Sequence, residues 1–336
     1  MLQTAHIGLG PLGARVATDL LTRGLGRPVA AVDPAPSIAG RPLADLLGSG
    51  PPDLVIHASI GEIPDWSRVR CAIVATSSDL EACMDTFREL LARGLAVVST
   101  CEELSWPWLR HPVLAAELHE LAVRHGGRIL GTGVNPGFLM ETLPIATTTL
   151  CNRVERVRVE RIQDAAPRRV PFQRKIGATL TPAQFEERVA EGTLRHVGLG
   201  ESLHALASHL GMKIERWEET IEPVLANKPL ESGLGPIPSG HAAGVRQVAR
   251  GWVGGEVRLE LVFVAAVGQP DPAERIEIEG DPPLRLEIPG GVHGDTATSA
   301  VVLNSIRSLL AAPPGLYTMG SLPLAGCAAP DGFASR

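Results

Sequence analysis

The sequence predicts two domains: an α/β domain on a doubly wound parallel sheet, and an α+β domain with an open, mainly antiparallel sheet. A glycine-rich turn between an apolar strand and a helix lies near the start, at residues 8–13. Short apolar runs and amphipathic helical patterns then alternate up to residue 131, as parallel βαβ units require. Beyond residue 151, apolar and polar residues alternate at period two, which is typical of antiparallel strands with one buried face.

The first domain is expected to alternate strands with helices. Its first strand is predicted to end within residues 6–10, and further strands are predicted over 28–33, 70–77, 96–100 and 127–131. Helices are predicted over 13–24, 79–94 and 111–126. The helix over 79–94 begins at Asp79, a residue type that caps helices, and ends at Gly94 after basic residues. This order indicates parallel strands joined by right-handed crossovers.

The second domain is expected to contain several antiparallel strands and three helices. The strands are predicted over 156–163, 213–221, 257–267, 275–280 and 284–288, and the helices over 181–192, 201–211 and 239–251. A last helix, over 294–310, is apolar enough to need two packing surfaces, so we place it back on the first domain. The predicted domains are therefore 1–134 with 294–336, and 135–293. Only the last dozen residues have the pattern of a loose tail.

Length and composition limit the function classes. The chain has 336 residues, and 44% of them are hydrophobic. This length exceeds what one hydrophobic core usually supports. The net charge of −6 without a basic cluster argues against nucleic-acid and membrane-surface partners. No apolar run approaches the roughly 20 residues of a membrane span and the polar start is no signal peptide, so we expect a cytoplasmic protein. The five scattered cysteines form no C-x-x-C pair, so neither disulfides nor a metal site is expected.

The glycine-rich turn fits the G-x-G-x-x-G pattern of a dinucleotide-binding (Rossmann) domain. Such glycines allow a tight turn, close approach of the backbone to a pyrophosphate, and close packing of helix on strand. The expected contacts are Gly8, Gly10, Pro11, Leu12 and Gly13. Asp33 ends the second strand about 20 residues later, where an acid binds the ribose 2′-hydroxyl. It would repel a 2′-phosphate, so NAD is favoured; NADP stays as the alternative if the loop of Arg41 folds back. A glycine turn without a ligand is the other interpretation.

Further cofactor contacts are expected where later strands end, because a doubly wound sheet binds its ligand beyond the carboxyl ends of its strands. The residues at these strand ends are Ala75, Thr76, Ser77, Ser99, Thr100 and Cys101. Thr76 and Ser77 are equally suited to capping the next helix. Asn135 lies in the glycine-rich turn over 131–138 and offers the donor and acceptor groups that a carboxamide needs. The same turn is also consistent with a hinge between the domains.

Two adjacent carboxylates, Glu102 and Glu103, continue from the strand over 96–100, near the place a nicotinamide would reach. Adjacent acids at such a point also suit the first turn of a helix. The residues that follow, 105–108, are Ser-Trp-Pro-Trp, an apolar and helix-breaking run. A carboxylate beside two indoles would be partly desolvated and suited to acid/base chemistry. We therefore expect at least one of the two glutamates to be functional.

Six segments together resemble the family that contains 2,4-diaminopentanoate dehydrogenase and the native NAD(P)-dependent amine dehydrogenases, which is related in fold to dihydrodipicolinate reductase. These segments cover residues 99–108, 131–138, 163–177, 195–203, 294–306 and 314–323. The resemblance extends over nearly the whole chain. It implies reversible oxidative deamination of an amine to a carbonyl compound and ammonia, with the second domain serving substrate binding and dimerisation, in a homodimer.

The resemblance also implies roles for particular residues. A glutamate after the strand near nicotinamide is the catalytic group; Glu102 is the better match and Glu103 the fallback. By position, the substrate pocket would include Phe138, Met140, Gln173, Thr298 and Val302. One departure is that the chain lacks the His-His-x-x-Lys stretch of dihydrodipicolinate reductase, which disfavours a cyclic dicarboxylate substrate.

Three functions stay open at this point. The preferred one is deamination of a simple amine by hydride transfer with carboxylate assistance. The second acts on 2,4-diaminopentanoate, whose carboxylate needs a cation, with Arg168, Arg169 and Arg174 as candidates. The third is a non-catalytic NAD sensor. A lysine Schiff base is disfavoured, because the three lysines, Lys175, Lys213 and Lys228, lie outside the cofactor loop and the segment of Glu102.

Overall fold

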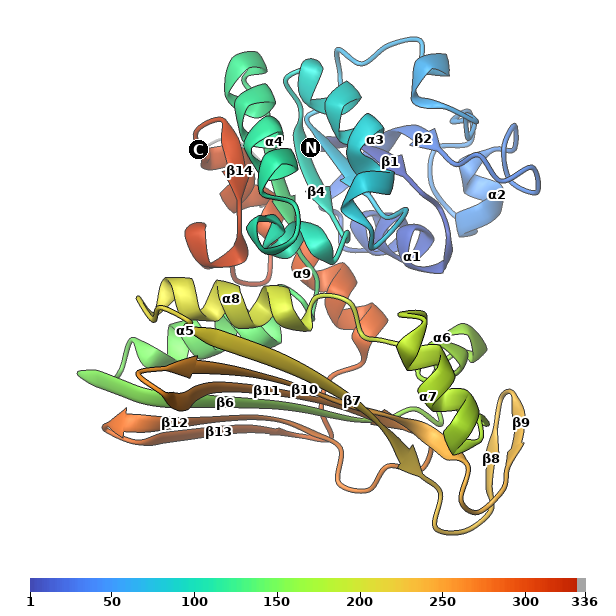
Figure 1. Ribbon diagram of the computed structural model, residues 1–336. Helices are drawn as coiled ribbons and strands as arrows, with labels where there is room; N and C mark the ends of the chain where they lie inside the picture. Colours follow the sequence, from blue (N-terminus) through green and yellow to red (C-terminus); the bar gives the residue numbers. More distant parts are fainter. Residues whose placement is uncertain (331–336) are drawn as a thin grey trace. The chain divides into compact units, whose positions relative to one another are not determined.

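The computed structural model describes residues 1–330, and the chain divides into two units (Figure 1). Unit 1 contains Met1–Phe138 and the C-terminal segment from His293, and unit 2 contains Leu139–Val292. Among the described residues, none of the helices has the length and hydropathy needed to cross a membrane. Within the same residues, no three His, Cys, Asp or Glu side chains are grouped so that they could hold a metal ion.

Unit 1 contains a six-stranded sheet in which every strand pair is parallel. Its strands are β1 (Leu2–Ile7), β2 (Gly26–Val32), β3 (Cys71–Val74), β4 (Ala96–Ser99), β5 (Arg128–Gly131) and β14 (Gly315–Tyr317). The order is β14-β5-β4-β3-β1-β2, so the direction of winding reverses between β1 and β3. This confirms the predicted doubly wound sheet and fixes the point where such sheets bind a ligand.

Helices pack on both faces of this sheet. They are α1 (Pro11–Thr22), α2 (Leu43–Leu47), α3 (Leu80–Ala92), α4 (Pro112–His125) and α9 (Gly294–Ala311), with short 3₁₀ turns at Ile60–Glu62, Glu103–Ser105, Pro107–Leu109 and Met319–Ser321. One apolar cluster joins α3 and α4 to the sheet, and another joins α1 and α9 to it. Asp79 caps α3 by accepting a hydrogen bond from the Ala82 N–H at 2.9 Å, as its residue type predicts. The long C-terminal helix α9 thus completes the core of unit 1.

Unit 2 is built on a second six-stranded sheet, in the order β13-β12-β6-β11-β10-β7. Its strands are β6 (Arg153–Asp164), β7 (Arg216–Leu225), β10 (Ala242–Val253), β11 (Glu256–Ala266), β12 (Ala273–Asp281) and β13 (Leu284–Pro289). Only the β11–β6 pair is parallel, which confirms the mainly antiparallel prediction. A small hairpin, β8 (Leu230–Ser232) and β9 (Gly235–Ile237), stands apart from this sheet.

The helices of unit 2 lie over one face of its sheet (Figure 1). They are a π-helical turn at Phe138–Thr142, α5 (Leu143–Thr148), α6 (Val170–Lys175), α7 (Pro182–Ala190) and α8 (Leu199–His209). The helix α7 begins with a capping box in which Thr181 and Gln184 exchange side-chain and backbone hydrogen bonds. Leu203 and Leu206 of α8 join the sheet residues Val159 and Leu261 in the main core of the unit.

The helix predicted over 239–251 is wrong, because this segment forms the strand β10. The many small residues of this segment hide its hydrophobic period. In addition, a strand that is buried on both faces lacks the alternation of apolar and polar residues by which a strand is identified. Val245 and Ala249 lie in the helix-covered core, while Val248 belongs to the cluster on the opposite face. Glycine is required at position 244, because a Cβ atom there would clash with the Ala265 carbonyl oxygen at 2.0 Å. Pairing with β7 and β11 therefore overrides the local helical pattern.

The C-terminal segment is more ordered than the predicted loose tail in the part that the structure describes. The guanidinium of Arg23 donates to the side-chain oxygen of Asn304 at 2.7 Å and to the carbonyl of Ala328 at 3.2 Å. The Ala328 N–H donates in turn to the Asn304 side chain at 3.0 Å. Residues 331–336 of the predicted tail lie outside the described residues.

Candidate functional site

The glycine turn after β1 has the geometry that a dinucleotide requires. Gly8 has a φ of +85°, and a Cβ atom there would lie 2.6 Å from the Ala75 carbonyl oxygen. A Cβ atom on Gly13 would lie 1.9 Å from the Gly8 carbonyl oxygen, so helix α1 packs directly on the turn. At Gly10, the N-cap of α1, no atom of the described residues lies within 4 Å of such a Cβ. No side chain caps this helix start and the space beside Gly10 is open among the described residues, as it must be where a pyrophosphate binds in this fold.

Asp33 is held beside this turn by two backbone hydrogen bonds. Its Oδ2 accepts from the Leu9 N–H at 2.7 Å and its Oδ1 accepts from the Ala35 N–H at 2.9 Å. The side chain keeps partial exposure, so it is placed to meet a ribose hydroxyl. Arg41 is exposed and reaches the Ser37 carbonyl oxygen at 3.5 Å, which places its guanidinium over its own loop.

The segment after β3 lies against the glycine turn. The Ala75 N–H donates to the Ile7 carbonyl at 2.8 Å, which continues the β1–β3 pairing. Thr76 Oγ1 lies 3.5 Å from the Cys83 thiol, and Ser77 Oγ accepts from the Asp79 N–H at 3.1 Å. Ser77 thus stabilises the start of α3, in agreement with its alternative interpretation as a helix-capping residue. It also follows β3, one of the two strands between which the winding of the sheet reverses.

The segment after β4 is fastened to the segment after β3. Ser99 Oγ donates to the Val74 carbonyl at 3.1 Å and accepts from the Cys101 N–H at 3.1 Å. The Thr100 N–H donates to the same Val74 carbonyl at 3.0 Å. The Cys101 thiol is 1% exposed and donates to the Ser78 carbonyl at 3.3 Å. These contacts bring the two strand ends together at one edge of the sheet.

The two adjacent glutamates have different surroundings. Glu103 is 7% exposed; its carboxylate accepts from the Leu80 N–H at 2.9 Å and lies 3.2 Å from His111 Nε2. Its own N–H donates to the Ser78 carbonyl at 3.2 Å. Glu102 is partly exposed and has one carboxylate oxygen buried, while its carbonyl accepts from Ser105 Oγ at 2.7 Å. The carboxylate of Glu103 therefore stabilises the start of α3, whereas Glu102 lies partly exposed at the edge of the sheet where β4 ends.

The Ser-Trp-Pro-Trp run forms two 3₁₀ turns rather than a longer helix. The rings of Trp106 and Trp108 meet edge to face, with centroids 4.9 Å apart. Trp106 is partly buried, while Trp108 is 40% exposed. Gly131 at the end of β5 allows close contact with these turns, because a Cβ atom there would lie 2.5 Å from the backbone of Leu104.

The turn that carries Asn135 is fixed by its glycines and by α9. Gly137 has a φ of +132°, and a Cβ atom there would lie 2.6 Å from the Gly133 carbonyl oxygen. The Val134 N–H donates to Thr298 Oγ1 at 3.2 Å, so the C-terminal helix holds the turn. Asn135 is partly exposed and its side-chain oxygen is buried. The amide thus lies at the same strand edge as Glu102.

The remaining residues expected at the substrate have buried, structural surroundings. Val302 lies in the core shared by α1 and α9, and Met140 lies in the core of unit 2. Gln173 is 1% exposed; its amide donates to the carbonyls of Ala165, Ala166 and Arg168 and accepts from the Gly233 N–H. Phe138 is partly buried at the start of the π-helical turn. Unit 1 therefore brings together the cofactor residues and both glutamates, whereas Met140 and Gln173 belong to unit 2.

Two polar residues, one in each unit, were not anticipated. His111 contacts Glu103 and also lies 3.6 Å from Glu81, and an isolated histidine at a helix start gives no signal of this in the sequence. Arg161 in unit 2 is 3% exposed and lies 3.4 Å from Glu274. Burial lowers the pKa of Arg161 to about 10, and Glu274 opposes that shift. The alternating pattern of β6 predicts an apolar residue at position 161, so the sequence alone does not indicate a buried arginine there.

Known proteins resemble the whole chain. Residues 138–333 match the 2,4-diaminopentanoate dehydrogenase C-terminal domain. A 2,4-diaminopentanoate dehydrogenase from Acetoanaerobium sticklandii is 28% identical over 331 residues, covering 95% of this chain and 92% of that protein. An amine dehydrogenase from Streptomyces virginiae is 25% identical over 77% of this chain and 78% of that protein. The solved structure of an amine dehydrogenase from Mycobacterium smegmatis superposes with a TM-score of 0.85, at 25% identity over 97% of both chains.

The parallel sheet, the glycine turn and the carboxylate at the strand edge define a class, the two-domain dehydrogenases of Rossmann type. Within this class the chain belongs to the 2,4-diaminopentanoate dehydrogenase family, since that family matches more than half of its residues. The resemblance inferred from the six sequence segments is confirmed.

Proposed function

We propose that this protein is an NAD(P)-dependent amine dehydrogenase. It converts a primary amine, an oxidised dinucleotide and water into a ketone or aldehyde, ammonia, the reduced dinucleotide and a proton, and it catalyses the reverse reductive amination. The observation that carries the proposal is the position of Glu102. It lies at the carboxyl edge of the sheet that bears the glycine turn and keeps partial exposure there, whereas its neighbour Glu103 is buried.

The residues at this edge fit a dinucleotide. The open helix start at Gly10 suits the pyrophosphate, and Asp33 suits the ribose hydroxyls. Ala75–Ser77 and Ser99–Cys101 would border the middle of the cofactor, and the amide of Asn135 would suit the carboxamide. When bound, the nicotinamide supplies the acceptor for a hydride from the amine carbon. The carboxylate of Asp33 favours NAD over NADP, since a 2′-phosphate would add like charge beside it.

Glu102 would act on the substrate twice. As a carboxylate it stabilises the positive charge that develops on the amine nitrogen as the hydride leaves, because opposite charge at a partly desolvated site favours that state. It then orients a water molecule and takes a proton from it during hydrolysis of the resulting imine. General base assistance of this kind contributes about 10²–10⁴-fold to a rate. In reverse, the same group handles the protons of ammonia and the carbinolamine.

A direct assay tests the proposal. NADH absorbance is followed with ammonium and a panel of small ketones and aldehydes, and NADH formation is followed with the matching amines. We expect NADH oxidation only when ammonium and a carbonyl compound are both present. NADH oxidation that needs no ammonium, or none with any carbonyl compound, would contradict the proposal; binding of NADH without turnover would favour the sensor instead.

Arg161 favours a second candidate, the deamination of an amino acid such as 2,4-diaminopentanoate. It is a buried cation on the helix-covered face of unit 2, 3.4 Å from Glu274, and Gln163 lies two residues further along the same face. Arg168 extends toward Gln163, with 3.5 Å between its Nη1 and the amide oxygen. A substrate carboxylate would need such a cation. Comparing kcat/KM for a ketone with and without a carboxylate decides between the two candidates.

We also propose that the protein is a homodimer, which the resemblance implies and which agrees with the prevalence of two-fold symmetric pairs among soluble oligomers. Sedimentation of the purified chain tests this state independently of activity. A single species with the mass of one chain at every concentration would contradict it.

A further inference from the structure

The amino edge of the unit 1 sheet, opposite the edge that bears the glycine turn, is rich in arginine. The segments at the starts of β2, β3, β4 and β5 contain seven arginines and one acid, Asp65; they cover residues 23–27, 64–70, 93–95 and 124–128. The exposed arginines of these segments are Arg27, Arg68, Arg70, Arg93 and Arg124. We call these five residues the arginine edge.

Pairing within the sheet brings Arg27 and Arg70 close together. Arg27 of β2 pairs in register with Gln3 of β1, and on the other side of β1 the Arg70 N–H donates to the Gln3 carbonyl at 2.9 Å. Their backbones are therefore two strand spacings apart, about 10 Å. The two arginines are distant in the sequence, so only the fold makes them neighbours.

Contacts between the segments continue the arginine edge toward β5. The guanidinium of Arg93 lies over the ring of Trp66, 5.1 Å from its centroid, which joins the segment before β4 to the segment before β3. A Cβ atom at Gly94 would lie 2.7 Å from the His125 carbonyl oxygen, so the segment of Arg93 packs against that of Arg124. The arginine edge is therefore continuous from β2 to β5, about 19 Å at the usual strand spacing.

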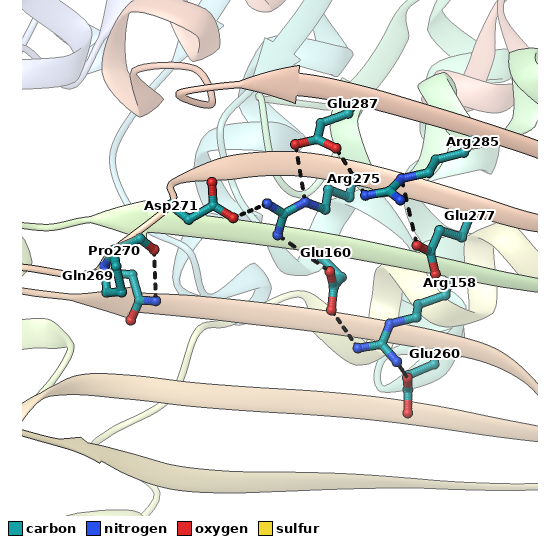
Figure 2. A network of polar contacts seen from close by, with 10 residues as sticks. All are labelled: Arg158, Glu160, Glu260, Gln269, Pro270, Asp271, Arg275, Glu277, Arg285 and Glu287. Atoms are coloured by element: carbon teal, nitrogen blue, oxygen red, sulfur yellow. Dashed lines mark hydrogen bonds and ion pairs between the residues drawn. The ribbon is translucent and has the colours of Figure 1, made fainter.

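Three members of the arginine edge have no acidic partner, in contrast to the arginines drawn in Figure 2. Each arginine of that network in the unit 2 sheet is ion-paired with at least two carboxylates; these arginines are Arg158, Arg275 and Arg285. Among residues 1–330, the side chains of Arg27, Arg70 and Arg124 form neither an ion pair nor a hydrogen bond. Their charges are therefore available to a partner.

Helix ends explain only part of this cluster. A helix C-terminus favours cations, and Arg93 follows α3 while Arg124 lies in the last turn of α4. Arg27 lies within β2, and Arg68 and Arg70 precede β3, so no helix end accounts for these three. The excess of arginine at this edge therefore needs a second explanation.

The distribution of charge favours a short acidic partner. Seven arginines against one acid give the four segments an excess of six positive charges, whereas the whole chain has a net charge of −6. The rest of the surface therefore repels a polyanion that extends well beyond the edge, such as duplex nucleic acid or an anionic membrane. A partner confined to the edge avoids most of that repulsion, because charges more than about 8 Å away are screened at physiological salt. An extended peptide of six residues spans about 20 Å, which matches the edge.

We propose that the arginine edge binds an acidic segment of a partner protein, about six residues long and in extended conformation. A guanidinium takes a carboxylate through two parallel N–H donors, so each unpaired arginine of the edge can bind one acidic side chain of the segment. The arginine edge lies at the amino ends of the strands and the glycine turn at their carboxyl ends, so such a partner leaves the cofactor turn open. The inference goes beyond the proposed dehydrogenase function and does not depend on it.

Fluorescence anisotropy with a labelled peptide of six glutamates, hexaglutamate, tests the proposal on the full chain at low ionic strength. We expect hexaglutamate to bind, and the affinity to fall as salt rises, since exposed ion pairs are screened. A peptide of three glutamates, triglutamate, covers only half of the edge. Its dissociation constant should be at least about tenfold higher, because it leaves several arginines without a carboxylate.

Charge reversal of single arginines identifies the contact. Arg27→Glu, Arg70→Glu and Arg124→Glu lie in three different segments, and each should raise the dissociation constant of hexaglutamate at least about threefold. The triple variant should lose binding. Arg188 on α7 is also exposed and forms no side-chain ion pair or hydrogen bond within residues 1–330. Arg188→Glu changes the net charge by the same amount, so it is the matched control and should bind hexaglutamate as the unsubstituted chain does.

Several results would overturn the proposal. One is an unsubstituted chain that does not bind hexaglutamate, and another is an equal loss of affinity in Arg188→Glu and in the three edge variants. Triglutamate that binds as tightly as hexaglutamate would exclude an extended contact. A single-stranded oligonucleotide, or a vesicle containing phosphatidylserine, that binds the same arginines more tightly than hexaglutamate would assign the edge to nucleic acid or to a membrane instead. Circular dichroism establishes that each variant is folded. Since anisotropy requires no turnover, a failure here is distinct from a failure of the amine dehydrogenase assay.

Discussion

The carboxylate of Glu103 accepts a hydrogen bond from the backbone N–H of Leu80 at 2.9 Å. Leu80 is the first residue of α3, so the carboxylate lies at the positive end of a helix dipole, with His111 Nε2 3.2 Å away. This contact also fastens the turn after β4 to the segment after β3. It separates the role of Glu103 from that of Glu102, the residue beside it.

Replacing Glu103 with alanine should therefore destabilise the fold. The Leu80 N–H would lose its acceptor and His111 would lose one of its two carboxylate partners, which together cost about 1–3 kcal/mol of unfolding free energy. Glu103→Gln keeps an oxygen acceptor and should lose less. Urea denaturation of the two variants checks this; equal stability of Glu103→Ala and the unsubstituted chain would show that the contact contributes nothing.

Replacing Glu102 with glutamine should remove turnover while leaving cofactor binding intact. Without a carboxylate, neither charge stabilisation nor proton transfer from water is available, so kcat should fall by about 10²–10⁴-fold. NADH affinity, measured by fluorescence titration, should stay close to that of the unsubstituted chain. Glu103→Gln is the matched control and should keep most of the activity; a larger loss there than in Glu102→Gln would transfer the catalytic role to Glu103.

The glycines of the cofactor turn should respond differently to the same added methyl group. In Gly13→Ala, the new Cβ atom would lie 1.9 Å from the Gly8 carbonyl, so the turn must shift and the melting temperature should drop clearly. In Gly10→Ala, the methyl group enters open space among the described residues, so the fold should survive while NADH affinity falls. Thermal melting and NADH titration of both variants distinguish packing from ligand contact.

His6 should make the stability of unit 1 sensitive to acid. Burial lowers its pKa from the ordinary 6.5 to about 4, because the strand interior disfavours the charged ring. Between these two values the unfolded chain binds more protons, so the free energy of unfolding falls as pH drops, by about 3 kcal/mol in total. Urea denaturation from pH 7 to 4 should show a shallower decline for His6→Gln. Parallel curves for the two proteins would assign the acid sensitivity to other groups.

Much of the fold could be predicted because local patterns and global packing agree. Asp79 and Thr181 cap the helices that their residue types predict, and the strands of unit 2 with one buried face alternate at period two. The prediction failed at β10, which pairs on both sides and is buried on both faces, so it lacks alternation. The short β14 was also missed. Its three residues are held by pairing with β5, a partner almost two hundred residues earlier in the chain.

The candidate site was predictable only in part. The glycine turn, Asp33 and the two glutamates could be proposed from the sequence, because each comes shortly after a predicted strand and parallel strands end at one edge of a sheet. The distinct roles of Glu102 and Glu103 do not, since they depend on where the start of α3 and His111 lie in space. Gln173 illustrates the same limit: its four hydrogen bonds reach carbonyl groups and an N–H that only the folded chain brings to it.

The sheet of unit 1 is assembled from both ends of the chain, with β1 first and β14 last. Unit 2 occupies one continuous segment, so a ribosome delivers all of its residues before α9 and β14 exist. During synthesis the second domain can therefore close its core first, whereas the nucleotide-binding sheet must wait, with the edge of β5 unpaired, until residue 317 emerges. Premature termination near the C-terminus would thus spare the domain encoded in the middle and disable the one that begins the chain.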